Sequence, residues 1–281
     1  MSSRRQHAAS RCIATIVAAA TVLLTAVDRV RAAEAVDLEL ILAVDVSGSI
    51  DDQEARLQRQ GYVDAFRDAE VIAAITSGPV GRIAVSYLEW AGSGLTNLVA
   101  DWALIDGRES GAAFSDRLAA QPVQTLLWTS ISGAIDRAVP MFERNGFEGL
   151  RRVIDISGDG ANNSGRLVTG ARDSALAAGI TVNGLPIING RPGPMGWPPT
   201  PNLDLYYEDC VIGGPGAFLV VAEGFADFGS AVRRKLILEI AGRLPQGRQA
   251  RRDARIWLAA DRARPPCDIG ERRLHNYMRL P

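Results

Sequence analysis

The segment VDLELILAVDVSGSI, residues 36–50, gives the clearest indication of the fold of this 281-residue chain. Its first part, Val36 to Val46, is almost entirely apolar and lacks the polar alternation of a half-buried strand. A strand of this kind is covered on both faces, as in a parallel sheet. We therefore expect a central strand here, followed by a Ser-Gly-Ser turn.

Strand and helix patterns alternate along the rest of the chain. This alternation predicts an α/β fold with a doubly wound, mostly parallel central sheet and helices on both faces. After the first strand, we expect a helix over 51–76, a strand over 81–91, a short edge strand over 97–105 and a helix over 110–120. A helix over 130–145, interrupted by Pro140, then leads to a strand over 152–157 and a helix over 167–178. The last expected elements are strands over 180–186 and 217–222 and a helix over 225–241.

Two acidic residues stand where central strands of this sheet should end. Asp45 closes the first strand and precedes Ser47 and Ser49, while Asp159 follows the strand at 152–157 after one glycine. In an open parallel sheet, ligands bind beyond the carboxyl ends of the central strands. Oxygen ligands of this kind suit Mg²⁺, Mn²⁺ or Ca²⁺. Ser and Asp before a helix also act as N-caps, which is the alternative explanation for Asp45, Ser47 and Ser49.

A third hydroxyl makes the pattern recognisable. Thr129 opens the segment TSISGAI, residues 129–135, ahead of the strand that leads to Asp159. Together with DVSGS at 45–49, these residues resemble the metal-ion-dependent adhesion site of the von Willebrand factor A domain. The resemblance departs from the common pattern at Gly158, where a threonine usually precedes the last acid.

Two further segments make the resemblance to this superfamily more specific. IDISGDG at 154–160 and YYEDCVIGGPGAF at 206–218 look like a bacterial exported branch of the von Willebrand factor A superfamily. The resemblance covers residues 36–241. It implies a Rossmann-like fold and a function in binding another protein.

Carried over residue by residue, the resemblance implies one divalent cation bound by Asp45, Ser47, Ser49, Thr129 and Asp159. The three hydroxyls would act as ligands, and the two acids would bind the ion directly or through water. Two carboxylates only neutralise a divalent cation, so the ion stays electrophilic. Mg²⁺ prefers octahedral coordination and keeps room for an outside oxygen, with Mn²⁺ or Ca²⁺ as alternatives. The family mode of binding implies that an Asp or Glu of a protein partner supplies this oxygen.

Several enzyme classes fit the sequence poorly. A Ser-His-Asp hydrolase needs an imidazole base, and the two histidines are His7, in the expected signal, and His275 near the other end. The single lysine, Lys235, does not follow a glycine-rich loop as in a phosphate-binding P-loop. We therefore expect no enzyme activity. The alternatives that stay open are a metal-assisted phosphoesterase, with Asp51, Asp52 or Glu208 as base, and a scaffold without metal.

The N-terminus predicts export. Arg4, Arg5 and Arg11 precede an uncharged apolar stretch at 12–27, and a small-residue site ends at Ala32. This is the layout of a secretory signal, and the apolar stretch is shorter than the roughly 20 residues that a spanning helix needs. We expect a signal peptide at 1–32 with cleavage after Ala32, a periplasmic or secreted protein, and no transmembrane segment afterwards. A retained membrane anchor is the alternative.

Charge and cysteine content describe the rest of the chain. Residues 243–281 contain ten arginines and four acids, whereas 33–242 contain sixteen bases and 27 acids. We expect a von Willebrand factor A-like domain at 33–242 and a basic tail at 243–281 that lies on the acidic domain, with no role in nucleic-acid binding. In an oxidising compartment Cys210 and Cys267 would form a disulfide, the alternative being two free thiols.

Overall fold

The computed structural model describes residues 33–192, 198–242 and 263–279. The expected signal peptide at 1–32 lies outside the described residues, and so do residues 243–262 of the expected tail. Among the helices in the described ranges, none has the length and apolar character needed to cross a membrane.

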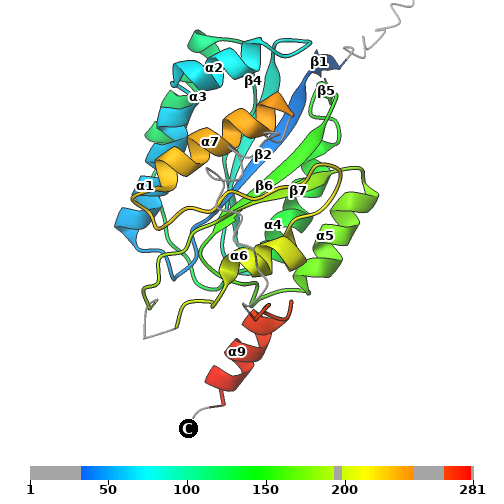
Figure 1. The fold of residues 1–281 in the computed structure, drawn as a ribbon. Coiled ribbons are helices and arrows are strands. Elements are labelled where there is room, and N and C mark those ends of the chain that lie inside the picture. Colours follow the sequence, from blue (N-terminus) through cyan, green and yellow to red (C-terminus); the bar gives the residue numbers. More distant parts are fainter. Residues whose placement is uncertain (1–32, 193–197, 243–262, 280–281) are drawn as a thin grey trace, which may run out of the picture. The chain divides into compact units, whose positions relative to one another are not determined.

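A five-stranded sheet in the order β4-β3-β2-β6-β7 forms the centre of the fold (Figure 1). β2, Leu38–Asp45, pairs in parallel with β3, Ile83–Trp90, and with β6, Arg152–Gly158. β7, Thr181–Pro186, continues the parallel part beyond β6, and β4, Thr96–Ile105, is an antiparallel edge strand beside β3. The prediction of a doubly wound, mostly parallel α/β sheet is confirmed.

The central position of β2 explains its apolar sequence. All of its residues are buried, and successive side chains enter two different cores. Leu40 and Leu42 belong to one hydrophobic cluster, whereas Ile41 and Ala43 belong to the other. The two-residue period of a strand is therefore present, but both faces are covered and apolar residues lie on both, with Glu39 and Asp45 as the polar residues of the strand.

Four helices pack over one face of the sheet (Figure 1). They are α1, Asp52–Ala65, α2, Ala69–Thr76, α3, Arg108–Ala120, and α7, Phe228–Ala241. α1 contacts both α3 and α7, and α2 contacts α7. These contacts place the last helix of the domain next to the first.

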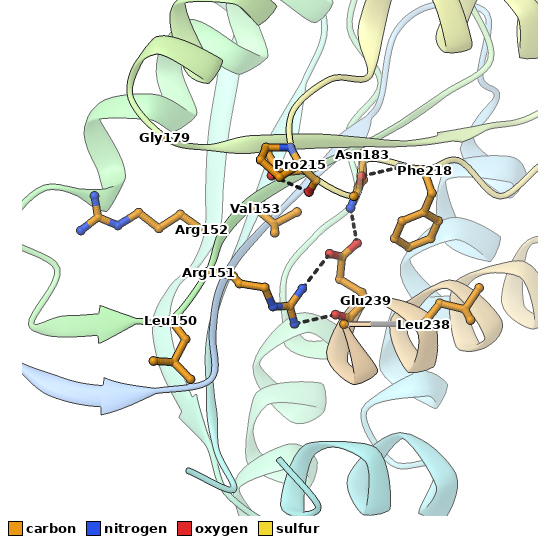
Figure 2. A pocket seen from close by; sticks show the side chains of 13 residues that line it. Leu150, Arg151, Arg152, Val153, Gly179, Asn183, Pro215, Phe218, Leu238 and Glu239 are labelled. Atoms are coloured by element: carbon orange, nitrogen blue, oxygen red, sulfur yellow. Dashed lines mark hydrogen bonds and ion pairs between the residues drawn. The ribbon is translucent and has the colours of Figure 1, made fainter. Parts of the chain in front are cut away.

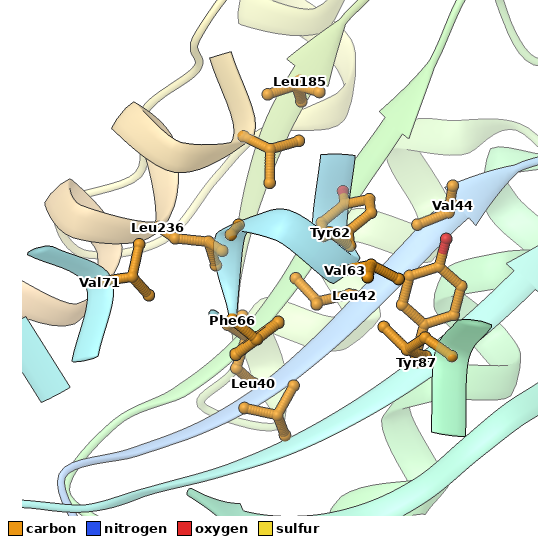
Figure 3. Packing of buried hydrophobic residues seen from close by; sticks show 14 of the residues in the cluster. Leu40, Leu42, Val44, Tyr62, Val63, Phe66, Val71, Tyr87, Leu185 and Leu236 are labelled. Carbon is orange, nitrogen blue, oxygen red and sulfur yellow. The ribbon is translucent and has the colours of Figure 1, made fainter. Parts of the chain in front are cut away.

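Side chains from these helices meet the β2 side chains in a continuous core, part of which Figure 3 shows. Phe66 at the end of α1 and Leu236 of α7 face Leu40 and Leu42 of the sheet. Tyr62 of α1 packs edge-on against Tyr87 of β3, with ring centroids 5.3 Å apart. Burial of such side chains contributes roughly 1.5–3 kcal/mol each, so this core holds α1 in place.

The opposite face is covered by α4, Ile131–Ala138, and α5, Val168–Ala177, which contact each other. The helix expected over 130–145 is interrupted at Pro140, as predicted, and regular helix does not continue beyond Phe142. It changes into a 3₁₀ helix, η1, Val139–Phe142, at Pro140, because proline lacks the backbone N–H that an α-helix uses.

The single helix expected over 51–76 is also wrong, since the chain forms two helices there. α1 ends at Ala65, and the carboxylate of Asp68 accepts hydrogen bonds from the backbone N–H groups of Glu70 and Val71. Asp68 therefore caps a new helix instead of continuing the old one. Aspartate competes for backbone N–H groups in this way, which makes it a poor residue for a helix interior.

Residues 217–222 do not form the strand that we predicted. They make only isolated parallel bridges to the β7 region, at Leu219 with Gly184 and at Ala222 with Ile187. Glycine and proline residues just before this segment limit regular pairing.

The sequence analysis missed a small sheet and a short helical segment. β1, Glu34–Val36, pairs in parallel with β5, Phe147–Gly149. α6, Leu203–Tyr206, runs directly into a π-helix, η3, Tyr207–Val211. These elements are only three to five residues long, too short for periodicity to show in sequence.

The described part of the basic tail is attached to the domain. Cys267 forms a disulfide with Cys210 of η3, 57 residues away in sequence, as expected. Arg264 forms ion pairs with Glu208 and Asp209, so basic tail residues do contact acidic residues of the domain. The tail continues as α9, Ile269–Tyr277.

Candidate metal centre

The two acids expected to bind metal lie at the same edge of the sheet. Asp45 is the last residue of β2, and Asp159 directly follows the last residue of β6. Because β2 and β6 are parallel neighbours, their carboxyl ends meet at this edge. Ser47 and Ser49 lie in the loop between β2 and α1, and Thr129 lies two residues before α4.

Hydrogen bonds connect four of these five side chains. The Ser49 hydroxyl donates to Asp159 Oδ1 over 2.5 Å, and it lies 3.3 Å from the Ser47 hydroxyl. The Thr129 hydroxyl donates to Ser47 Oγ at 3.4 Å. Asp45 joins the set through Oδ1, which accepts the backbone N–H of Ser47 at 2.7 Å. The structure thus brings all five predicted residues together.

This cluster is mostly hidden from solvent. Asp45 and Ser47 are fully buried, and Thr129 is 6% exposed. Burial raises the pKa of Asp45 well above its usual value, and the nearby charge of Asp159 raises it further. Burial also raises the pKa of Asp159 to about 6, although the hydrogen bond from Ser49 acts in the opposite direction. Ionising both the buried Asp45 and the neighbouring, half-buried Asp159 is therefore costly unless positive charge compensates.

One oxygen of the cluster lacks a hydrogen-bond partner. Asp45 Oδ2 is buried, and none of the described residues donates to it. A buried carboxylate oxygen without a donor is expensive, and a cation would satisfy it. The donor set of two carboxylates and three hydroxyls consists of oxygen only, which is the chemistry of a hard divalent cation. The five residues therefore fit such an ion.

Hydrogen bonds with three amide side chains hold the loops of the candidate metal ligands in position. Thr129 donates its N–H to Asn163 Oδ1 at 2.9 Å, and its carbonyl accepts the N–H of Asn163 at 2.8 Å. Gln58 Nε2 donates to the carbonyl of Asp45 at 3.1 Å, and Asn189 Nδ2 donates to Asp159 Oδ2 at 3.3 Å. The sequence analysis missed Gln58, Asn163 and Asn189, since an amide side chain gives no motif that marks such a contact.

The structure weakens the helix-capping explanation for this cluster. Asp51 caps α1 by accepting from the N–H groups of Gln53 and Glu54. Ser130 caps α4 by accepting the N–H of Gly133 at 3.1 Å. The caps are therefore residues next to the cluster, and the hydroxyls of Ser47, Ser49 and Thr129 serve no helix.

The residues considered as a catalytic base are also engaged elsewhere. Asp51 is the α1 cap, Asp52 accepts a hydrogen bond from Thr125 at 3.3 Å, and Glu208 forms an ion pair with Arg264. None of these contacts aims a base at the cluster around Asp45.

Two cavities differ in their relation to this edge. One, of about 970 Å³, includes Arg152, Val153 and Thr181 in its lining, so it lies at the start of β6 and β7 and away from the cluster (Figure 2). The other, of about 790 Å³, is lined by Gly48 of the ligand loop and by Leu127, two residues before Thr129. Only the second adjoins the candidate metal centre.

Comparisons with solved structures bear on the fold. Proximal thread matrix protein 1 of the mussel byssus superposes with a TM-score of 0.54 at 12% identity, over 74% of this chain and 49% of that one. A second structure of the same protein, described as having a zinc-occupied MIDAS motif, gives a TM-score of 0.50 at 13% identity, over 75% and 47%. The pilus adhesin SpaC from Lactobacillus rhamnosus GG gives 0.51 at 12% identity, over 73% and 31%.

This chain thus spans about half the length of the mussel protein and about a third of SpaC. At these identities the similarity concerns the fold, which is that of the von Willebrand factor A domain, as predicted. No curated protein matches the chain. A family model described as "Protein of unknown function (DUF1194)" matches residues 35–244, which is most of the chain, and the protein therefore belongs to the DUF1194 family.

Proposed function

We propose that this protein is an exported binding domain that holds one divalent cation at the carboxyl edge of its sheet. Asp45, Ser47, Ser49, Thr129 and Asp159 bind the ion, and Mg²⁺ is the expected metal. An Asp or Glu side chain of a protein partner completes its coordination. Residues 1–32 act as the signal that directs the chain to the periplasm or the medium.

The observation that carries the proposal is the pairing of two acids, the buried Asp45 and the half-buried Asp159, with three hydroxyls. Asp45 and Ser47 are fully buried, and Asp45 Oδ2 has no donor among the described residues. A divalent cation offsets the charge of Asp159, which raises the pKa of Asp45 beyond the effect of burial. Since the hydroxyls are neutral, the bound ion keeps its affinity for an additional carboxylate.

Exposed apolar side chains next to the centre support protein binding. Leu127 is 63% exposed and Trp128 is 47% exposed, and both directly precede Thr129. Large exposed apolar side chains gathered at one site are typical of interaction surfaces, and Trp is enriched among residues that dominate binding energy. A partner carboxylate at the metal would bring neighbouring residues of that partner onto Leu127 and Trp128.

The backbone around Trp128 is held in a costly conformation. Trp128 has φ of +67°, in the left-handed region that non-glycine residues rarely adopt. Its neighbours fix this geometry, because Gly92 donates its N–H to the Leu127 carbonyl at 3.1 Å and Ser130 donates to the Ala91 carbonyl at 2.7 Å. Strain of roughly 1–3 kcal/mol kept at a surface position is common at binding sites.

The solved structures are consistent with this proposal. The mussel protein that shares the fold has been described with zinc in its MIDAS motif, and SpaC is a pilus adhesin. Those properties belong to those proteins. They make a metal-dependent binding function the first one to test here.

The test is affinity capture from a cell-envelope extract, with the purified protein as bait in Mg²⁺ or in chelator. We expect one partner to be captured in Mg²⁺, released by chelator, and lost with Asp159→Asn bait. Asp136→Asn is the matched control, because Asp136 is an exposed acid paired with Arg166. Capture that persists in chelator and with Asp159→Asn would rule out the proposal. Assaying the same proteins for phosphoesterase turnover checks the rival function.

A further inference from the structure

Tyr207 lies against the metal centre at the place where the sequence departs from the common pattern. A Cβ atom built on Gly158 would lie 2.7 Å from Asp45 Oδ2 and 3.0 Å from the Tyr207 hydroxyl oxygen. The first distance is shorter than real Cβ atoms show, and the second is tighter than nine in ten real Cβ contacts. A side chain at position 158 would therefore displace the Asp45 carboxylate and crowd the Tyr207 hydroxyl, which favours glycine here.

Both of these oxygens are among the buried side-chain atoms that lack a hydrogen-bond partner within the described residues. Tyr207 is fully buried, and its hydroxyl has no hydrogen-bond partner among the described residues, as is also true of Asp45 Oδ2. Buried hydroxyls and carboxylates are nearly always hydrogen-bonded. Two buried groups that lack partners and lie on either side of Gly158 indicate a contact that provides a hydrogen bond to each of them.

Further features of the fold fix the position of the Tyr207 ring. A Cβ atom on Gly184 of β7 would lie 2.8 Å from Tyr207 Cδ1, so a second glycine, in the strand next to β6, also makes room for this side chain. Tyr207 begins the π-helix η3, which the disulfide at Cys210 ties to the tail. Short π-helical segments occur often at functional sites.

We propose that Tyr207 is a further residue of the metal centre. When a cation is bound, the Tyr207 hydroxyl donates a hydrogen bond to Asp45 Oδ2, directly or through one water, whereas the two groups are not bonded in this structure. Tyr207 acts as a positioning residue. Asp45 Oδ1 is already held by the Ser47 N–H, so the tyrosine fixes the second oxygen and with it the plane of the carboxylate. This inference rests on the proposed metal binding and gives a role to the YYEDC segment, which the five ligands leave unexplained.

The two adjacent tyrosines of this segment allow a crossed test. Tyr206 is also fully buried, but its hydroxyl accepts the backbone N–H of Asn162 at 3.1 Å. Removing the Tyr206 hydroxyl leaves the buried N–H of Asn162 without an acceptor. Removing the Tyr207 hydroxyl leaves no unpaired donor behind in the metal-free protein, because that hydroxyl has no partner there. The variants Tyr207→Phe and Tyr206→Phe therefore separate metal positioning from stability.

The experiment measures Mn²⁺ affinity by calorimetry and the melting temperature in chelator for the full protein and both variants. We expect Tyr207→Phe to bind Mn²⁺ about 10-fold more weakly, the lower end of the range for groups that orient metal ligands, with an unchanged or higher melting temperature. We expect Tyr206→Phe to melt at lower temperature and to keep its Mn²⁺ affinity within about twofold.

Other results of the Mn²⁺ titration and melting experiments would contradict the proposed role of Tyr207. If the wild type and Tyr207→Phe bind Mn²⁺ equally well, the role of Tyr207 is wrong and the proposed metal centre stands. If both tyrosine variants lose stability and affinity together, Tyr207 is a packing residue and the inference is overturned. If the wild type binds no Mn²⁺, the proposed function fails and the inference fails with it.

Discussion

The hydroxyl of Ser49 donates a hydrogen bond to the carboxylate of Asp159, although the two residues are 110 positions apart in the sequence. The contact exists because β2 and β6 are parallel neighbours and end at the same edge of the sheet. It joins the loop after the first strand to the loop after β6. A ligand at this point would therefore link distant segments, and this has consequences for stability.

Divalent metal should stabilise the protein against unfolding. A cation that binds only the folded state at a hundredfold excess over its Kd adds about 2.7 kcal/mol to the free energy of unfolding. Thermal unfolding followed by circular dichroism, with Mg²⁺ or Mn²⁺ against chelator, measures this effect. We expect a rise of several degrees for the wild type and none for Asp159→Asn.

The metal-free protein should be less stable at pH 7 than at pH 5 because of its two neighbouring acids, Asp45 and Asp159. Burial raises the pKa of Asp159 to about 6 and raises the pKa of Asp45 well above its usual value. A carboxyl group with a raised pKa in the folded state contributes stability at low pH, and this contribution is lost as the pH rises through that pKa. Metal binds the deprotonated acids, so metal affinity should change the other way and increase from pH 5 to pH 7.

Asp45→Asn separates this effect from the titration of other groups. The amide is neutral at every pH, so the variant should be more stable than the wild type at pH 7 in chelator, and this advantage should shrink at pH 5. The same variant should lose metal-dependent stabilisation. Melting curves of both proteins at the two pH values, with and without Mg²⁺, give the comparison. An equal pH dependence of the two proteins in chelator would show that Asp45 does not titrate as described.

Thr129 and Ser130 should have opposite roles although they are neighbours. Thr129→Val keeps the side-chain shape and removes the hydroxyl, so it should weaken Mn²⁺ binding at least 10-fold, as for loss of a metal-site contact, with little loss of stability. Ser130→Ala removes the cap of α4, so it should cost roughly 0.5–2 kcal/mol of stability and keep the metal. Calorimetric titration with Mn²⁺ and urea unfolding of both variants provide the two readouts. If Thr129→Val binds Mn²⁺ normally, Thr129 is no ligand.

Trp128 should matter for the partner and not for the ion. Its side chain is 47% exposed beside Thr129, so Trp128→Ala should reduce Mg²⁺-dependent capture of the partner by about tenfold or more, the effect of losing a dominant interface residue. Its Mn²⁺ affinity should equal that of the wild type. Leu150→Ala is the control, because Leu150 is 68% exposed at the other end of the sheet, two residues before β6 begins. Equal capture by both variants would place the partner elsewhere.

The sequence predicted structure best where a run of similar residues, or an acid at a strand end, has one common structural explanation. The apolar run at 36–46 predicted the central strand, and the acids at the ends of β2 and β6 predicted the cluster. The break between α1 and α2 was missed because Asp68 lies within a pattern that is otherwise helical, and only the hydrogen bonds of its carboxylate show that it caps a new helix.

The contribution of Tyr207 could not be predicted from the sequence. Gly158 marked a departure from the expected motif, but nothing in the chain connects it to a residue 49 positions later. That connection needs the two glycines at 158 and 184 to lie on adjacent strands, with the tyrosine ring against both. It is a property of packing between distant segments.

A crystal structure grown with Mn²⁺ shows whether five side chains surround one divalent cation. We expect one anomalous scattering peak among the oxygens of Asp45, Ser47, Ser49, Thr129 and Asp159, with the hydroxyl oxygens at about 2.0–2.6 Å, the range that spans Mg²⁺ and Ca²⁺. A well-ordered site in which these side chains contact only one another, or a manganese peak bound elsewhere, would show that the five residues do not form a metal site.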